Sequence, residues 1–184
     1  MTTFGVRSKM RTPSTPAQEP MTLRRAQLTC CAIVCAIASV GCAVEAQTPR
    51  DSVIATVQEF FRTMEANDAT GAARILTPDG LAYATQMRGD SVIVRSRSFQ
   101  SHLDRLRAAR DVILERMWNP VVQVHQTVAM VWTPYDLYVN GKFSHCGIDV
   151  FTLVKERDGW KVANVSYTVE PTGCAPSPLG PPRR

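Results

Sequence analysis

Two aspartates and a histidine in the most regular part of the sequence have side chains suited to acid–base chemistry. Asp136, His145 and Asp149 lie on either side of the dipeptide Asn140-Gly141. A carboxylate beside an imidazole raises the pKa of the imidazole, which can then act as a general base near neutral pH. A carboxyl group held in a dry pocket can instead carry a proton to or from a substrate. We therefore take these three as candidate catalytic residues, with a purely structural Asp–His pair as the alternative.

An expected β-hairpin positions these residues. Asn-Gly between two alternating apolar runs is typical of a type I′ turn, because both turn positions need positive φ. With Asn140 and Gly141 as the loop, Asp136 lies opposite His145, and Trp132 lies opposite Asp149. Side chains alternate between the faces of a strand, so one face gathers the aromatic and polar residues. That face carries Trp132, Asp136, Tyr138, Phe143, His145, Asp149 and Phe151, and a second hairpin turning at Asp158-Gly159 adds Asn164, Ser166 and Thr168.

The composition of this face is typical of a mostly apolar pocket with a few orienting polar groups. Packing in a core explains aromatic residues at such positions equally well. The predicted ligand-binding residues are Trp132, Tyr138, Phe143, Phe151, Asn164 and Ser166.

The opposite face is almost uniformly apolar, and we expect it to pack against a second copy in a homodimer. A β-bulge in either strand would exchange the two faces. The apolar face carries Val131, Tyr135, Leu137, Cys146, Ile148, Val150, Val154, Val165 and Tyr167.

A metal site is not expected, because His145 and Asp149 supply at most two ligands. The sequence also has no glycine-rich phosphate loop and no nucleophile elbow, so we expect no cofactor. His102 is expected on a solvated, charged helix face. Arg95 and Arg97, two residues apart on a strand, are placed either to meet an anionic ligand or to face water.

The first 46 residues have the pattern of an export signal. After an upstream extension, a start at Met21 is followed by Arg24-Arg25, a short apolar run, and small residues that end at Ala46. The pattern predicts cleavage near Ala46 and a periplasmic or secreted protein. A retained membrane anchor is the alternative, although the run is short for a bilayer. A partial lipoprotein box at Cys42 leaves a lipidated, membrane-bound form open.

Removal of this segment lowers both the net charge and the number of cysteines that the domain itself carries. The remaining chain has 16 basic and 14 acidic residues, a net charge of +2, which gives no support for nucleic-acid binding. It keeps two cysteines, Cys146 and Cys174, which we expect to form a disulfide in an oxidising compartment. Two free thiols are the alternative.

Apolar periodicity and capping residues predict helices before the long strands. Thr48 is placed to cap the first helix, and Ser98 is placed to cap the third. The expected order is a helix over 48–66, a short helix over 69–76, a turn at Thr77–Gly80, a hairpin over 81–97, a helix over 99–111, a strand over 112–124 and three further strands. We therefore divide the chain into a signal segment (1–46), a domain (47–170) and a Pro/Gly-rich tail (171–184).

This order, with W-T-P-Y-D-L-Y-V-N-G-K-F-S-H-C-G-I-D-V-F-T-L-V and D-G-W-K-V, resembles the nuclear transport factor 2-like (NTF2-like) superfamily. Within it, the chain is most similar to the exported bacterial branch described as putative lumazine-binding, a relative of the SnoaL-like proteins. The resemblance covers roughly residues 51–167. It implies a conical α+β fold, with three N-terminal helices on the concave face of a curved antiparallel sheet. It also implies frequent dimers and a pocket between sheet and helices.

Three functions remain open from the sequence. The first is an exported domain that binds a small, partly apolar ligand. The second is an isomerase, cyclase or hydratase that transfers protons through Asp136, His145 and Asp149. The third is an envelope interaction or assembly module. Enzymes and non-enzymes share this fold, so the fold does not decide among them.

Overall fold

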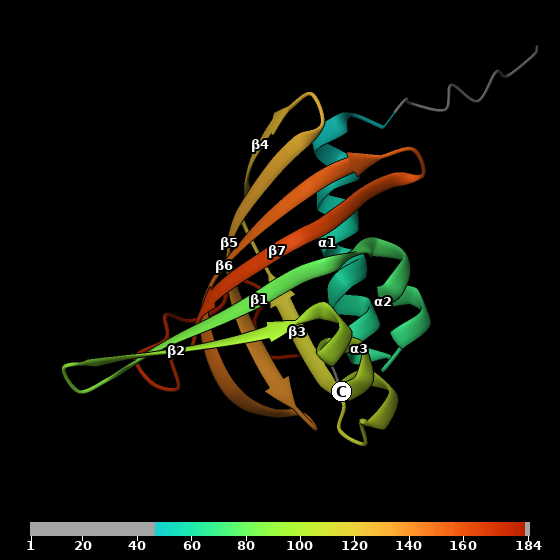
Figure 1. Ribbon diagram of the computed structural model, residues 1–184. Coiled ribbons are helices and arrows are strands. Elements are labelled where there is room, and N and C mark those ends of the chain that lie inside the picture. Colours follow the sequence, from blue (N-terminus) through green and yellow to red (C-terminus); the bar gives the residue numbers. More distant parts are fainter. Residues whose placement is uncertain (1–46, 183–184) are drawn as a thin grey trace, which may run out of the picture. The chain divides into compact units, whose positions relative to one another are not determined.

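Three helices lie on one face of a single curved sheet (Figure 1). The computed structural model describes residues 47–182. The helices are α1 (Pro49–Glu65), α2 (Ala69–Ile75) and α3 (Phe99–Ala108). The hydroxyl of Thr48 accepts a hydrogen bond from the Asp51 backbone N–H, and the hydroxyl of Ser98 accepts one from that of Ser101. Both predicted N-caps are thereby confirmed.

The seven strands form one open sheet in the order β2-β1-β7-β6-β5-β3, with β4 also paired to β5. The α+β class is confirmed, but the expectation of a wholly antiparallel sheet is wrong, because β1 and β7 run parallel. No turn joins these two strands, so their connection does not impose an antiparallel direction. The strands are β1 (Leu76–Arg88), β2 (Ser91–Ser98), β3 (Ile113–Met117), β4 (Val121–His125), β5 (Val128–Val139), β6 (Lys142–Glu156) and β7 (Gly159–Thr168).

The strand expected over 112–124 and the turn expected at Thr77–Gly80 both differ from the structure. The strand expected over 112–124 is broken between β3 and β4, where Asn119 has a φ of 46° and precedes Pro120. Proline lacks the N–H that would continue the ladder. The turn expected at Thr77–Gly80 lies instead within β1, at an irregularity in its pairing with β7.

The β5–β6 hairpin begins as predicted and then shifts. Asn140 and Gly141 form the turn with φ values of 52° and 76°, and Tyr138 lies opposite Phe143. The next pair joins Leu137 to His145, so Ser144 is an extra residue in β6. This β-bulge changes every later pair by one position.

The bulge exchanges the faces of β6 relative to β5. Asp136 lies opposite Cys146, and Asp149 lies opposite Thr133, instead of the predicted partners. We call the helix-covered face of the sheet the inner face and the opposite one the outer face. The single aromatic and polar face predicted from the sequence is therefore divided between the two.

The β6–β7 hairpin is also shifted from its predicted register. Glu156 pairs with Gly159, so Arg157 and Asp158 form the loop rather than Asp158 and Gly159. A second irregularity follows at Ala163, which is the extra residue between two adjacent pairs.

The hydrophobic core fills the space between the helices and the inner face. It joins apolar residues of α1 and α3 to β5, β6 and β7, and it fixes which side of each strand is buried. Its members include Val53, Val57, Phe60, Phe61, Phe99, Leu103, Leu106, Val131, Phe151, Leu153, Trp160, Val162 and Val165. Within residues 47–182, no helix has the length and apolar character needed to cross a membrane.

Candidate functional site

The structure separates the three candidate catalytic residues. Asp149 lies on the inner face and is 2% exposed, and His145 lies on the same face but is partly exposed. Asp136 lies on the outer face. The prediction that all three share one face is therefore wrong, because the bulge at Ser144 reverses β6 after the turn. No common acid–base site includes Asp136.

Asp136 is held in an ion pair with a residue that the sequence reasoning missed. Arg116 lies directly opposite it on β3. The Arg116 Nε donates to Asp136 Oδ1 at 2.9 Å, and one terminal nitrogen donates to Oδ2 at 2.6 Å. That nitrogen also donates to the Gly180 carbonyl oxygen at 2.9 Å. Both carboxylate oxygens have partners, so Asp136 is a structural group that fastens β3 and the tail to β5.

Asp149 instead faces another carboxyl group. Glu115 lies on the inner face of β3, close enough for the two carboxyl groups to affect each other's pKa. Burial, together with the nearby Glu115, raises the pKa of Asp149 well above its usual range. Burial also raises the pKa of Glu115. Two carboxyl groups this close cannot both ionise cheaply, so the pair keeps a proton on Asp149 at neutral pH.

A glycine and a tyrosine form the floor beside this pair. A side chain at Gly147 would overlap the Thr168 carbonyl oxygen and the ring of Tyr135. Because Gly147 has no side chain, the Tyr135 ring can lie over it, and the Tyr135 hydroxyl donates to the Thr168 carbonyl oxygen at 2.7 Å. Burial and the nearby Glu115 and Asp149 raise the pKa of Tyr135 beyond the physiological range. Tyr135 is therefore a fixed neutral donor and an apolar wall.

His145 does not have the environment expected of a general base. Its Nδ1 lies 2.9 Å from the Ser144 hydroxyl, and its ring packs edge-on against Tyr135 with centroids 5.7 Å apart. Burial lowers the pKa of His145, whereas the predicted aspartate partner would have raised it.

His102 is partly buried, where a solvated helix face was expected. Its ring stacks on Phe60 with centroids 5.5 Å apart. Burial, with the nearby charges of Arg97 and Arg105, lowers the pKa of His102 to about 4. Its Nε2 and one carboxyl oxygen of Asp149 are buried without a hydrogen-bond partner in the part of the chain that the structure describes. Both atoms lie on the side where the helices cover the sheet.

The predicted ligand-binding residues are also divided by the bulge. Phe151 is fully buried in the core on the inner face, while Trp132 is 47% exposed on the outer face. Trp132, Tyr138, Phe143, Asn164 and Ser166 are on the outer side, where Ser166 donates to the Asn164 side chain at 3.2 Å. The six residues do not form one ligand cage.

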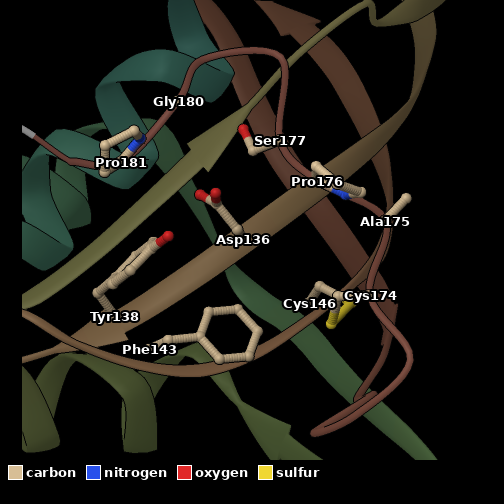
Figure 2. Close-up of a pocket in the computed structure, with 10 residues that line it drawn as sticks. All are labelled: Asp136, Tyr138, Phe143, Cys146, Cys174, Ala175, Pro176, Ser177, Gly180 and Pro181. Atoms are coloured by element: carbon tan, nitrogen blue, oxygen red, sulfur yellow. A yellow bond between two sulfur atoms is a disulfide. The ribbon is translucent and has the colours of Figure 1, made fainter.

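A hollow of about 320 Å³ lies on the outer side, between β5, the start of β6 and the C-terminal tail (Figure 2). Asp136 and the rings of Tyr138 and Phe143 form its sheet side, and tail residues from Cys174 to Pro181 close over them. A second groove, of about 260 Å³, runs between α1 and β3 and is lined by Phe61, Glu115 and Met117. This groove reaches Glu115, one member of the carboxyl pair.

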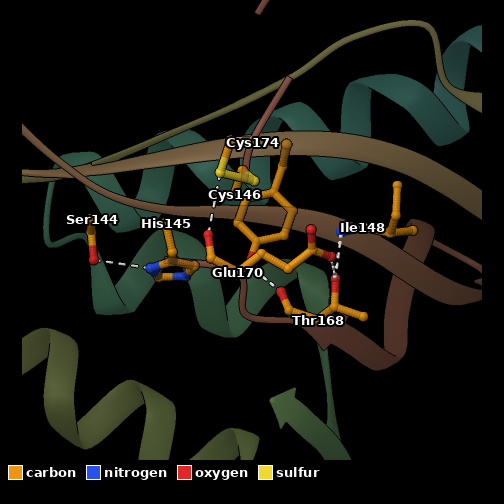
Figure 3. The surroundings of a disulfide bond; sticks show 8 residues. Ser144, His145, Cys146, Ile148, Thr168, Glu170 and Cys174 are labelled. Atoms are coloured by element: carbon orange, nitrogen blue, oxygen red, sulfur yellow. Dashed lines mark hydrogen bonds between the residues drawn. A yellow bond between two sulfur atoms is a disulfide. The ribbon is translucent and has the colours of Figure 1, made fainter. Parts of the chain in front are cut away.

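The predicted disulfide joins Cys146 to Cys174 and anchors the tail (Figure 3). Cys146 and Glu170 exchange backbone hydrogen bonds of 3.1 and 2.9 Å just before the tail turns back. The Cα atoms of the two cysteines lie 6.0 Å apart, within the normal range for a bridge. The second hairpin was predicted one residue out of register, but Cys174 still reaches Cys146.

Glu115 is the important inner-face residue that sequence reasoning missed. It is followed directly by Arg116 in Ile113–Met117, and this pair of charged residues within a short strand was the available signal. Its proximity to Asp149 follows from the pairing of β3 with β5, and local sequence patterns do not specify that pairing. Among residues 47–182, no cluster of three or more His, Cys, Asp and Glu side chains is arranged to hold a metal ion.

Comparison with known proteins supports the fold. Residues 48–168 match the model of a family described as "Putative lumazine-binding". No curated protein matches the chain. Among solved structures, an NTF2-like protein from Cytophaga hutchinsonii is 10% identical, with a TM-score of 0.55 over 66% of this chain and 98% of its own.

Two further solved structures have the same fold under different descriptions. A protein from Streptomyces avermitilis, titled a putative dehydratase of the NTF2-like family, is 16% identical, with a TM-score of 0.50 over 68% of this chain and 96% of its own. The CaMKII hub of S. rosetta is 14% identical, with a TM-score of 0.52 over 66% of this chain and 97% of its own. At these identities the likeness shows the fold alone, and the fold is NTF2-like.

Proposed function

Since the chain belongs to the putative lumazine-binding family and has an NTF2-like fold, we propose that its domain binds a small, partly apolar molecule between the sheet and the helices. One observation carries the proposal. An oxygen of Asp149 and the Nε2 of His102 are buried without partners on the inner side of the sheet. A buried polar atom without a partner costs about 1–3 kcal/mol, and a ligand that bonds to both atoms would recover that cost.

The chemistry of these groups defines the ligand that would fit. A protonated Asp149 donates a hydrogen bond, so it favours a carbonyl oxygen or an unprotonated ring nitrogen. Phe60, Phe61 and Phe151 pack edge-on against one another nearby, with centroid separations of 5.6–5.9 Å. These rings favour an apolar or aromatic ligand body. The groove beside Glu115 supplies a route of entry.

Native mass spectrometry of the protein purified from an exporting host tests this proposal. We expect a copurifying small molecule on the wild-type domain and its loss in Asp149→Leu, which keeps the approximate size but removes the hydrogen-bond donor. The matched control is Ser166→Ala on the outer face, which should keep the ligand. A ligand retained by Asp149→Leu and lost by Ser166→Ala would place the site on the outer face and contradict the proposal.

One observation favours an enzyme as the second candidate. Burial raises the pKa of both carboxyl groups of the Glu115–Asp149 pair, so the pair holds a proton at neutral pH that it can donate to a substrate and take back. This differs from the mechanism predicted through Asp136 and His145, since neither belongs to the pair. Hydrogen–deuterium exchange into a copurified ligand, abolished by Glu115→Gln, would distinguish turnover from binding.

We also propose export and self-association, which rest on different observations. The signal-like pattern before Gln47 lies outside the described residues, and the Cys146–Cys174 bridge is a feature of oxidising compartments. The apolar face expected to form the dimer is not free, because its Val131 and Val165 are buried in the core under the helices. Exposed Val121, Val128 and Trp132 on the outer face offer a different apolar contact for a second copy. N-terminal sequencing would locate cleavage near Ala46 or a lipidated Cys42, and light scattering would give the subunit count.

A further inference from the structure

Two arginines lie at the other end of the inner face from the Glu115–Asp149 pair. Arg97 lies on β2 opposite Ala82, which packs against the core and is itself opposite Val165. Directly paired residues share a face, so Arg97 is on the inner face. Arg105 lies on α3, one helical turn after His102, and the charges of both arginines act on His102.

Neither arginine has an anionic partner within residues 47–182. No carboxylate oxygen there lies within 4 Å of Arg97 or Arg105, whereas Arg62, Arg107 and Arg116 are all paired. Arg97 is also partly buried, and burial and the nearby Arg105 lower its pKa. A half-buried guanidinium beside a second cation is unfavourable unless an anion joins it.

The buried Nε2 of His102 and the ring of Tyr167 connect this cluster to the carboxyl pair. Tyr167 lies on the inner side of β7. Burial raises the pKa of its hydroxyl; the charges of Glu115 and Asp149 add to that rise, and those of Arg97 and Arg105 oppose it. Tyr167 is paired with Asp149 on one side, and β1 and β2 lie on its other side, so it lies between the carboxyl pair and Arg97 on the inner face. His102, with its unpartnered nitrogen, lies at the basic end.

We propose that Arg97, Arg105 and His102 form an anion subsite that binds the carboxylate of the ligand, while Asp149 binds an uncharged acceptor at its other end. This inference rests on the proposed function and specifies its ligand as an aromatic or apolar carboxylic acid that also carries a carbonyl group. The planar guanidinium of Arg97 can donate two parallel hydrogen bonds to a carboxylate. The sequence has no glycine-rich loop of the kind that cradles phosphate, which favours a carboxylate.

Binding of para-acetylbenzoate and of its neutral amide, para-acetylbenzamide, tests the subsite by calorimetry. Both compounds carry the acetyl carbonyl, and only the first is an anion. We expect Arg97→Gln to weaken binding of the acid by about tenfold or more and to leave the amide unchanged. Arg105→Gln, at the exposed rim, should weaken binding of the acid less. The matched control is Arg107→Gln on the same helix, whose partner is Asp104 and which should change neither affinity.

The His102 ring provides a second, local readout by NMR. A bound anion offsets the positive charges of Arg97 and Arg105, so the acid should raise the pKa of His102 from about 4, and the amide should not. This measurement separates an anion in the subsite from one bound elsewhere. Arg105→Gln serves the same test if Arg97→Gln fails to fold, since Arg105 is exposed.

The outcomes separate this inference from the proposed function. If Asp149→Leu weakens binding of both compounds while the arginine variants change neither affinity, the subsite is refuted and the ligand site stands. If the arginine variants weaken binding of the acid while Asp149→Leu changes neither affinity, the subsite stands and the acceptor contact is refuted. Failure of the wild-type protein to bind either compound at millimolar concentration would overturn both.

Discussion

Asp136 and Asp149 lie on adjacent strands, and both are almost fully buried, yet their surroundings differ in kind. On the outer face, both oxygens of Asp136 are bonded to Arg116, and the tail covers the pair. On the inner face, Asp149 meets Glu115, and one of its oxygens has no partner in the described part of the chain. A buried carboxylate is tolerated when a cation neutralises it, whereas a carboxyl without a cation keeps its proton.

This difference indicates where function is to be expected. The Asp136–Arg116 pair has its hydrogen bonds filled within the protein, so it stabilises the fold and has little left to offer a ligand. The Glu115–Asp149 pair has unfilled bonding capacity and a proton available at neutral pH, which are the properties of a binding or catalytic group. Burial alone therefore does not identify the site, and the partner of each carboxyl does.

The largest effect should come from breaking the outer pair. Arg116→Leu leaves the Asp136 carboxylate, whose side chain is 5% exposed, without a cation. We expect a loss of about 3–5 kcal/mol in the free energy of unfolding, measured by denaturant titration. The double variant Arg116→Leu with Asp136→Leu should recover most of that loss. A double variant as unstable as the single one would show that the tail contact, and not the charge, is what matters.

Removing the disulfide should have the next largest effect. Cys174→Ser opens a bridge with a sequence separation of 28 residues, and we expect a loss of about 2–4 kcal/mol in unfolding free energy. The tail should also become more accessible to proteases, because the bridge holds it over the outer face. Reductant should destabilise the wild-type protein and leave the variant unchanged. Equal sensitivity of both proteins to reductant would contradict this account.

The inner pair should make stability depend on pH. Unfolded carboxyl groups titrate near about pH 4, and burial raises the folded pKa of Asp149 and of Glu115. Their contribution to stability is complete below the unfolded pKa and is lost as the pH rises through the folded values, by up to about 1.4 kcal/mol per pH unit for each proton. Asp149→Asn should therefore flatten this fall in unfolding free energy between acidic and neutral pH.

The control for this pH effect is Ser166→Ala on the outer face, which removes no titrating group and should keep the wild-type slope. A wild-type protein whose stability rises with pH over the same interval would contradict a raised pKa for the inner pair. His102 acts in the opposite direction, because its lowered pKa removes stability as the pH falls below its unfolded value near about 6.5. The carboxyl effect is therefore best measured on a His102→Gln background.

The smallest effect is expected for the outer-face residues that the sequence placed in the pocket. Trp132→Ala and Ser166→Ala change partly exposed side chains away from the inner pair, so the Ser166 variant should alter stability by less than about 0.5 kcal/mol. Neither variant should alter ligand affinity in calorimetry. A loss of subunit association in Trp132→Ala would still be consistent with the proposed dimer contact. A loss of ligand in both variants would move the binding site to the outer face.

The sequence determined the features that depend on neighbouring residues. Thr48 and Ser98 cap helices because their hydroxyls reach N–H groups three residues away. Asn140-Gly141 turns the hairpin because its two residues tolerate positive φ. The order of helices and strands and the Cys146–Cys174 bridge were likewise predictable, and together they were enough to indicate the fold family.

Only the tertiary structure decided which side chains meet. Neither the bulge at Ser144 nor the parallel pairing of β1 with β7 has a local signal, because each depends on how the whole sheet packs on the helices. One extra residue moved Asp149 and Phe151 to the face opposite Asp136, and the placement of β3 brought Glu115 to Asp149. A hairpin turn fixes only the pairing of the residues next to it. Beyond a bulge, the register is fixed by which side chains are buried in the core, and that register decides which polar groups meet in the site.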